Sequence, residues 1–329
     1  HCNWSLLTNT GINIFDPDTL AKDNMQFLLY IMAVVEGIDR YADILRASTA
    51  TPGNDHRLGG HEAPPAIISI FLGEQLQQLL ENIEDIDTSS TEEGMIDIDI
   101  HIPKIPKDFS DRNRTSPFAF TGNKFEFRMP GSSASPSTPV FVLNTIILRE
   151  YADSLSENAS SKNINTSIIK LIKDRYKKHK RIIFNGNGYE GSWIEQAEEL
   201  GLSNLKNTIE GLPVYTKEET IALFERNGIL TREEVYSRYK IYCDRYNNQS
   251  NIEITTAVRM ARNEIYPCIT KYINNISQMI NNVRTALGEE EFIQYDKEHL
   301  IKVIGYKNRL KDTITKLNEG TKKAFSISD

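Results

Sequence analysis

Cysteine and long apolar runs are scarce in this 329-residue sequence, and positive charge is not in excess. The three cysteines, Cys2, Cys243 and Cys268, lie far apart and outside any Cys/His cluster, which argues against a disulfide framework and a structural zinc site. The longest apolar run, residues 25–35, is interrupted by Gln26 and is shorter than the roughly 18 residues that a membrane helix needs. We therefore expect a protein of the reducing cytoplasm that makes no contact with a membrane.

Acidic residues outnumber basic ones, with 45 Asp and Glu against 38 Lys and Arg and a formal net charge of −7. Binding to nucleic acid by charge neutralisation is therefore not the expected function. One locally basic stretch, residues 170–181, is predicted to be a solvated helix face or an ion-pair patch between subunits rather than an RNA-binding surface. The composition, 39% hydrophobic and 25% charged, is typical of a globular protein.

The sequence changes character at about residue 150. Residues 1–150 mix helical patterns, strand patterns and loops rich in Gly and Pro, whereas residues 151–329 read as consecutive helices. The predicted fold class is α+β. Because the chain opens at His1 without a Met or a leader, we expect it to be a piece of a longer protein.

Periodicity predicts most of the elements. A helix is expected from the Asp16-Pro17 pair to Leu45, residues 66–86 fit both strand and helix patterns, and strand-like patterns cover 95–102 and 115–129. Further helices are predicted at 139–157, 163–179, 190–200, 216–226, 231–247, 254–287 and 293–318. The last two carry near-heptad apolar stripes with Gly288 between them, which predicts an antiparallel helical hairpin over 254–318.

Two motifs resemble binding sites but have a plainer interpretation. The run from Gly186 to Gly191 matches the GxGxxG dinucleotide signature, yet no second strand with an acidic end follows it, so we expect a loop between helices. Asp97, Asp99 and His101 line one face of the 95–102 strand. A solvated strand face is the expected interpretation there, and a divalent-cation site is the alternative.

Polar groups of catalytic type gather in three segments, residues 1–6, 53–65 and 111–130. In the last segment, strand alternation places Lys124, Glu126 and Arg128 on one face, with Phe125, Phe127 and Met129 behind them. A carboxylate between two cations suits a site for a metal and an anion, and it equally suits a structural ion-pair ladder. The spacing alone does not favour either interpretation.

These segments resemble glutamine synthetase, and specifically its long type III form. The matching runs are HCNWSL at 1–6, NDHRLG at 54–59, EAPPAIIS at 62–69 and DRNRTSPFAFTGNKFEFRMPGSSASP at 111–136. The helical second half, with FNGNGY at 184–189, is similar to the C-terminal extension of that form. The resemblance thus covers essentially the whole chain.

The resemblance implies a fold, an activity and partners. Residues 1–150 would be the C-terminal part of a catalytic split β-barrel wrapped by helices, and 151–329 an all-helical C-terminal extension. The activity would be ATP-dependent ligation of ammonia to L-glutamate through γ-glutamyl phosphate, with Mg²⁺ or Mn²⁺ as the metal. The partners would be these substrates and further copies of the chain in a double-ring, dodecamer-like homo-oligomer, with no nucleic acid and no membrane.

The matching motifs also imply roles for individual residues. Metal ligands are expected at His1 and Glu126. Nucleotide contacts are expected at Asn3, Ser5 and Lys124, with Lys124 standing where the common bacterial form has an arginine.

The glutamate and phosphoryl groups are expected to meet four further side chains. Arg57 matches the arginine that binds glutamate, although the loop from it to Glu62 is one residue shorter than in the common bacterial form. Glu62 matches the flap glutamate that closes the ammonium pocket and takes a proton. Arg114 and Arg128 match arginines near the transferred phosphoryl group and the glutamate carboxylates.

The resemblance places the family's other metal-binding glutamates and its N-terminal β-grasp domain before His1. We therefore expect a parent protein that is a glutamine synthetase, and a 329-residue piece that is inactive and prone to aggregation alone. Two alternatives stay open: a non-catalytic homologue acting as a ligand sensor or assembly scaffold, and a ligase of the family that uses another amine.

Overall fold

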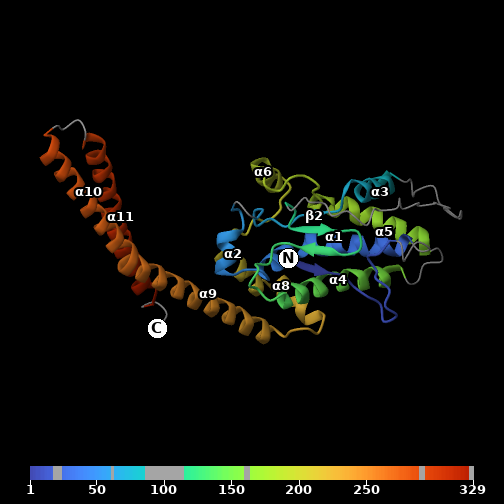
Figure 1. The fold of residues 1–329 in the computed structure, drawn as a ribbon. Coiled ribbons are helices and arrows are strands. Elements are labelled where there is room, and N and C mark those ends of the chain that lie inside the picture. Colours follow the sequence, from blue (N-terminus) through green and yellow to red (C-terminus); the bar gives the residue numbers. More distant parts are fainter. Residues whose placement is uncertain (18–23, 61–62, 86–114, 159–163, 289–292, 326–329) are drawn as a thin grey trace. The chain divides into compact units, whose positions relative to one another are not determined.

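Four short strands form one mixed sheet in the computed structural model, which describes residues 1–17, 24–60, 63–85, 115–158, 164–288 and 293–325 (Figure 1). The strands are β1 (Cys2–Trp4), β2 (Ile70–Phe71), β3 (Phe118–Phe120) and β4 (Phe125–Phe127), and their order is β1-β4-β3-β2. β4 pairs antiparallel with both β1 and β3, whereas β2 pairs parallel with β3. The strand-like pattern over 115–129 is therefore two strands, joined by a turn in which Gly122 has a φ of 91°.

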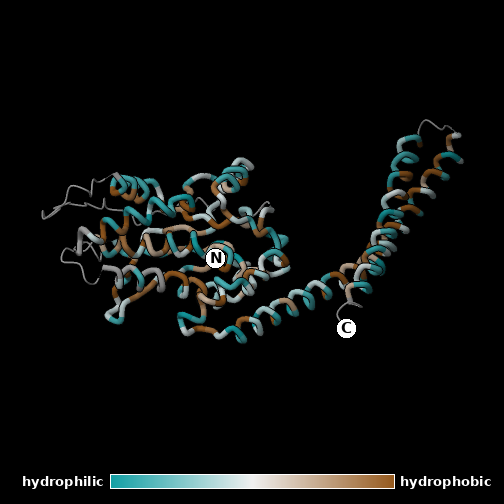
Figure 2. The backbone as a smooth tube through the Cα atoms, turned by 180° about the vertical axis from the view of Figure 1, so that it is seen from behind, coloured by the Kyte–Doolittle hydropathy of each residue, from teal (hydrophilic) through white to brown (hydrophobic). Residues whose placement is uncertain are grey.

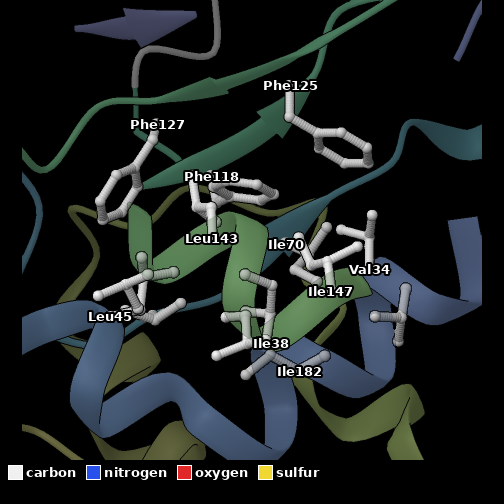
Figure 3. Close-up of a cluster of buried hydrophobic side chains, with 14 of the residues drawn as sticks. Val34, Ile38, Leu45, Ile70, Phe118, Phe125, Phe127, Leu143, Ile147 and Ile182 are labelled. Atoms are coloured by element: carbon white, nitrogen blue, oxygen red, sulfur yellow. The ribbon is translucent and has the colours of Figure 1, made fainter. Parts of the chain in front are cut away.

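Helices pack on one another and on this sheet. The main ones are α1 (Asn24–Ala47), α3 (Glu74–Asp85), α4 (Ser137–Asn158) and α5 (Ile164–His179), and α1 contacts both α4 and α5. Figure 3 shows the sheet and the helices contributing side chains to one buried cluster, which includes Val34, Ile38, Leu45, Ile70, Phe118, Phe125, Phe127, Leu143, Ile147 and Ile182. The apolar stripe that predicted the first helix is thus its buried face.

Shorter elements connect the rest of this region. They are α2 (Pro52–Arg57), η1 (Lys180–Ile182), α6 (Gly191–Glu199), α7 (Thr208–Gly211), η2 (Leu212–Thr216) and α8 (Glu218–Arg226). The ambiguous run 66–86 contains both a strand, β2, and a helix, α3. The GxGxxG motif lies in the loop between η1 and α6, and its last glycine, Gly191, is the first residue of α6, as expected for a loop between helical elements.

Some expectations need correction or lie outside the described residues. Pro17 lies in a turn, and the described part of the first helix begins at Asn24, so the expected start at Asp16-Pro17 is wrong. The predicted strand 95–102, with Asp97, Asp99 and His101, lies outside the described residues.

The basic stretch 170–181 is tied to acidic residues of the same chain. Arg175 pairs with Glu36 at 2.7 Å, and Asp39 accepts from both His179 Nδ1 at 2.7 Å and Arg181 Nε at 2.9 Å. These contacts join α5 and η1 to α1. The expectation of a solvated face is therefore wrong for Arg175, whose side chain is 10% exposed. It holds for the exposed Lys170, Lys177 and Lys178, and Arg181 is exposed while pairing within the chain.

The chain divides into two compact units, His1–Cys243 and Asp244–Asp329. The division does not fall at the change of sequence character near residue 150, because α4 and α5 pack on α1 within the first unit. The fold is mostly helical with a small mixed sheet, in agreement with the α+β class. The described strands do not close into a barrel, so the split barrel stays a prediction.

Long helices make up the second unit, and the first of them, α9 (Arg232–Met260), begins before the unit boundary. α9 leads through a π-helical turn, η3 (Ala261–Ile265), into α10 (Tyr266–Leu287), and α11 (Gln294–Phe325) packs along α10. Gly288 has the left-handed conformation at the end of α10, and the predicted hairpin over 254–318 stays a prediction. The expected break near 248–253 is wrong because that run holds no Gly or Pro; the irregular turn lies instead just before Pro267, which cannot donate a helical hydrogen bond.

Hydrophobic positions alternate with hydrophilic ones along α10 and α11 (Figure 2). This is the pattern of a helix that buries one stripe. Across the described residues, no helix combines the length and the apolar character that crossing a membrane requires.

Candidate active site

Six of the nine predicted site residues lie on one face of the β1–β4 pair. Asn3 and Glu126 are register partners, while Cys2 and Trp4 on β1 and Phe125 and Phe127 on β4 are buried in the core. Because side chains alternate along a strand, the opposite face carries the polar set. Its members are His1, Asn3, Ser5, Lys124, Glu126 and Arg128.

Glu126 is held from both sides on this face. His1 Nδ1 lies 2.9 Å from Glu126 Oε1, and Arg128 Nε donates to Glu126 Oε2 at 2.9 Å. The Glu126 side chain is 20% exposed, and Arg128 is 5% exposed. The ion pairing that the sequence left as one of two interpretations is therefore present, and it leaves Glu126 within reach of a ligand.

A metal ion would find two donors here. His1 and Glu126 offer an imidazole nitrogen and a carboxylate oxygen 2.9 Å apart, and His1 is 44% exposed. No group of three or more His, Cys, Asp or Glu side chains that could hold a metal occurs in the part of the chain that the structure describes. The pair fits a divalent cation whose remaining ligands come from water, phosphate or residues beyond this set.

The region expected to contact nucleotide is fixed by an asparagine that the sequence analysis missed. Ser5 Oγ donates to Asn13 Oδ1 at 2.7 Å, and Asn13 Nδ2 donates to Asn123 O at 2.7 Å. Asn13 thus joins the loop after β1 to the β3–β4 turn, next to the exposed Lys124. Its only sequence signal is an amide side chain in the loop that follows β1.

Arg57 approaches the same region from α2. The helix begins where Thr51 caps it and Pro52 takes the first position. The Arg57 guanidinium donates to Met129 O at 2.9 Å and to Arg128 O at 2.8 Å. Arg57 therefore fastens α2 to the end of β4, directly beside Arg128.

Asn54 completes this link and was also missed from the sequence. Its side chain is 2% exposed; Nδ2 donates to Thr49 O and Met129 O, both at 2.9 Å, and Oδ1 accepts from Arg57 Nη1 at 3.1 Å. Among the described residues, only the Nε–H and one Nη2 proton of Arg57 remain without a protein acceptor. A ligand of Arg57 would have to use these protons.

Glu62 and Arg114 lie outside the described residues, but their neighbours do not. Gly59 N donates to Pro64 O at 3.0 Å, which brings the two ends of the 59–64 segment together. Thr115, next to Arg114, directly precedes the segment that enters β3. Behind the polar face, Cys2 is a core residue, and its burial raises the pKa of the thiol.

Comparison with known proteins gives matches along the whole chain. Residues 167–284 match the glutamine synthetase C-terminal domain. The chain is 40% identical to a type-3 glutamine synthetase of Dictyostelium discoideum over 326 residues, which is 96% of this chain and 44% of that protein.

Two bacterial proteins show the same coverage. The chain is 36% identical to a glutamine synthetase of Butyrivibrio fibrisolvens, over 100% of this chain and 47% of the relative, and 36% identical to one of Bacteroides fragilis, over 98% and 46%. The chain thus spans just under half the length of the curated relatives that it matches. Identity at this level over nearly every residue places the chain in the glutamine synthetase family.

Proposed function

We propose that this chain is the C-terminal part of a ligase that joins ammonia to L-glutamate at the expense of ATP and forms glutamine. The observation that carries the proposal is the joined set of His1, Glu126 and Arg128, because it combines two metal donors with a buried guanidinium on one sheet face. Such a set suits charge neutralisation during phosphoryl transfer. Family membership supports the same reaction.

His1 and Glu126 would hold a divalent cation, Mg²⁺ or Mn²⁺, which would neutralise phosphate charge when bound. Arg128 orients the Glu126 carboxylate through Nε, and its guanidinium adds positive charge beside it. Asn3 and Lys124 are exposed on this face and Ser5 is partly exposed, and these three residues would contact ATP. Glutamate would be bound by Arg57 and Arg128.

Two predicted catalytic residues complete the reaction in this proposal. Arg114 would stabilise the phosphoryl group during transfer to the γ-carboxylate of glutamate, which gives γ-glutamyl phosphate. Glu62 would then accept a proton from ammonium, so that ammonia attacks the acyl carbon and phosphate leaves. The resemblance of the runs 62–69 and 111–136 to glutamine synthetase supports these roles.

The rest of the proposal concerns assembly. The β1-β4-β3-β2 sheet would be part of the split barrel of the catalytic domain, with residues 1–150 contributing to that domain and 151–329 extending it. Large apolar side chains are exposed along α9–α11, including Ile252, Ile265, Leu287, Tyr295, Ile301 and Tyr306, and they support a homo-oligomer in which other copies cover them. The cytoplasm remains the proposed location. Because His1 and Glu126 are the only two metal ligands proposed among the described residues, the isolated chain would be inactive.

The test is γ-glutamyl transfer to hydroxylamine, with Mn²⁺ and nucleotide, by the natural protein that contains this chain. We expect Glu126→Gln to lower kcat by about 100-fold or more, because the amide is a poor ligand for a divalent cation and a poor partner for Arg128. Glu195→Gln, at an exposed position on α6, is the control and should keep wild-type activity.

Two results would contradict the proposal. Full activity in Glu126→Gln would remove Glu126 from the site. A folded, oligomeric wild-type protein that transfers no γ-glutamyl group would instead favour a non-catalytic scaffold or a ligase for another amine.

A further inference from the structure

The loop of residues 184–190, which contains the GxGxxG motif, is bonded to the sheet region of the first half of the chain. Its first backbone N–H, that of Phe184, donates to Ile70 O at 2.9 Å. Asn185 Oδ1 accepts from the backbone N–H groups of Leu72 and Gly73, each at 3.1 Å. A single side chain therefore satisfies two donors at the junction of β2 and α3.

The ring of Phe184 makes a second anchor. It stacks on Trp193 with ring centroids 3.8 Å apart and planes inclined by 17°. Both rings belong to a small buried cluster with Ile67 and Ala197. Ile67 lies in the segment that runs from Pro64 to β2, so the loop is also packed on that segment.

Gly188 makes the closest contact. It is buried, and a Cβ built on it would lie 2.4 Å from Thr115 O and 3.6 Å from Pro64 Cβ. No side chain larger than hydrogen fits there without displacing the backbone. In contrast, a Cβ on Gly191, the last glycine of the same motif, meets nothing within 4 Å. Gly188 therefore allows another segment of the chain to approach closely, and that segment leaves no room for a phosphate.

The two segments that Gly188 touches carry proposed catalytic groups. Thr115 follows Arg114 by one planar peptide unit, and Pro64 follows Glu62 by two. Pro64 O is also the acceptor that closes the 59–64 segment through Gly59 N. A side chain at position 188 would therefore have to displace the backbone of Thr115, the residue that follows Arg114 in the sequence.

We propose that the 184–190 loop is a positioning element for the ligase site, in which Gly188 and Asn185 hold the backbone on which Arg114 and Glu62 depend. The inference rests on the function proposed above and extends the site to a part of the chain that contributes no reacting group. It also predicts which kinetic step depends on the loop. Glutamate activation and amination should depend on it, whereas nucleotide binding at Asn3, Ser5 and Lys124 should not.

The experiment compares Gly188→Ala with Gly191→Ala in the natural protein that contains this chain. We expect Gly188→Ala to lower kcat of γ-glutamyl transfer at least about tenfold, since misplacement by an ångström costs up to about 100-fold. The KM for nucleotide should stay within about twofold. Gly191→Ala should match wild type. Asn185→Ala introduces no clash and should also lower kcat. This second variant tests the proposal even if Gly188→Ala does not fold.

Hydrogen exchange separates the two proposals. In Gly188→Ala, amides of 115–120 and 66–70 should exchange faster than in wild type, with α10 unchanged. Unchanged exchange, or wild-type kcat in both Gly188→Ala and Asn185→Ala, would overturn this inference alone. A kcat loss matched by an equal rise in nucleotide KM would also overturn it, because the effect would then be general. An inactive wild-type protein would overturn the ligase function, even with the exchange result as expected.

Discussion

Glu126 and Arg57 show how individual side chains combine structural and proposed catalytic work. Each is bonded within the protein, Glu126 to His1 and Arg128, and Arg57 to two backbone carbonyls and Asn54. Such bonds fix the side chain before a substrate arrives, which lowers the entropic cost of binding. A substitution would therefore remove the proposed catalytic contact, and it would also leave a partner such as the buried Asn54 without its hydrogen bond.

Tyr176 provides a residue-scale prediction about pH. Burial, with a smaller contribution from Glu81 and Glu84, raises the pKa of Tyr176 from 10.0 to about 12. Its ionisation is thus easier in the unfolded chain, so the stability it contributes is complete below pH 10 and is lost as the pH rises towards 12. A shift of this size corresponds to about 2–3 kcal/mol at most.

We expect Tyr176→Phe to resist unfolding in that alkaline window better than wild type, relative to their stabilities at pH 8. The measurement is urea unfolding followed by circular dichroism at several pH values. Tyr189→Phe, which removes an exposed phenol, is the control. Parallel pH profiles for wild type and Tyr176→Phe would refute the prediction.

At the scale of elements, charged side chains contribute to the packing of α5 on α1, which the sequence pattern did not predict. Glu36 and Asp39 on α1 meet Arg175 and His179 on α5 and Arg181 on η1. Arg175 is 10% exposed and Asp39 4% exposed at the side chain, so removing one partner would leave a nearly buried charge. The network holds the helix that precedes the 184–190 loop against the core helix.

In the pair of helices α10 and α11, we expect alanine substitutions at two glycines to change stability in opposite directions. Gly288 has a φ of 68° at the end of α10, where an Ala side chain is strained, so Gly288→Ala should destabilise by about 1 kcal/mol. Gly305 lies inside α11, and a Cβ there meets nothing within 4 Å, so Gly305→Ala should stabilise by about 0.5–1 kcal/mol.

Chemical denaturation of the hairpin, monitored by exchange of α10 and α11 amides, measures both effects. Changes of the same sign at the two positions would contradict the left-handed geometry at Gly288 or the open space at Gly305.

For the molecule as a whole, the two units differ sharply in how much apolar surface they bury. Among the described residues, the second unit buries only Val258, Ile280, Ile293 and Ile314, whereas the first contains the large core around α1. A two-helix hairpin with so little core is weakly stable alone. This agrees with the proposal that other copies cover its exposed side chains.

We therefore expect two stages in the unfolding of the isolated 329-residue chain. Amides of α10 and α11 should exchange at least tenfold faster than those of the buried part of α1, because local opening of the hairpin exposes little apolar surface. Hydrogen exchange followed by mass spectrometry measures this. Equal protection in α1 and α10 would mean that the chain unfolds as one cooperative unit.

Local sequence patterns were enough to predict much of the structure of this protein. The apolar stripes of α1, α10 and α11, the hairpin turn at Gly288, and the alternation that puts Glu126 opposite the phenylalanines follow from periods of 3.6 and 2 residues, which depend only on neighbours in sequence. The motifs carried the family assignment. The roles of the nine predicted site residues stay predictions.

Only the tertiary structure decided how distant segments meet. The bonds from Arg57 to the end of β4, the ion pairs between α5 and α1, and the approach of Gly188 to Thr115 each join residues more than 70 positions apart. The unit boundary after Cys243 lies inside α9 and has no local signal, and the packing of α4 and α5 on α1 keeps residues on both sides of position 150 in one unit. Such contacts depend on shape and charge across whole elements, which no local period encodes.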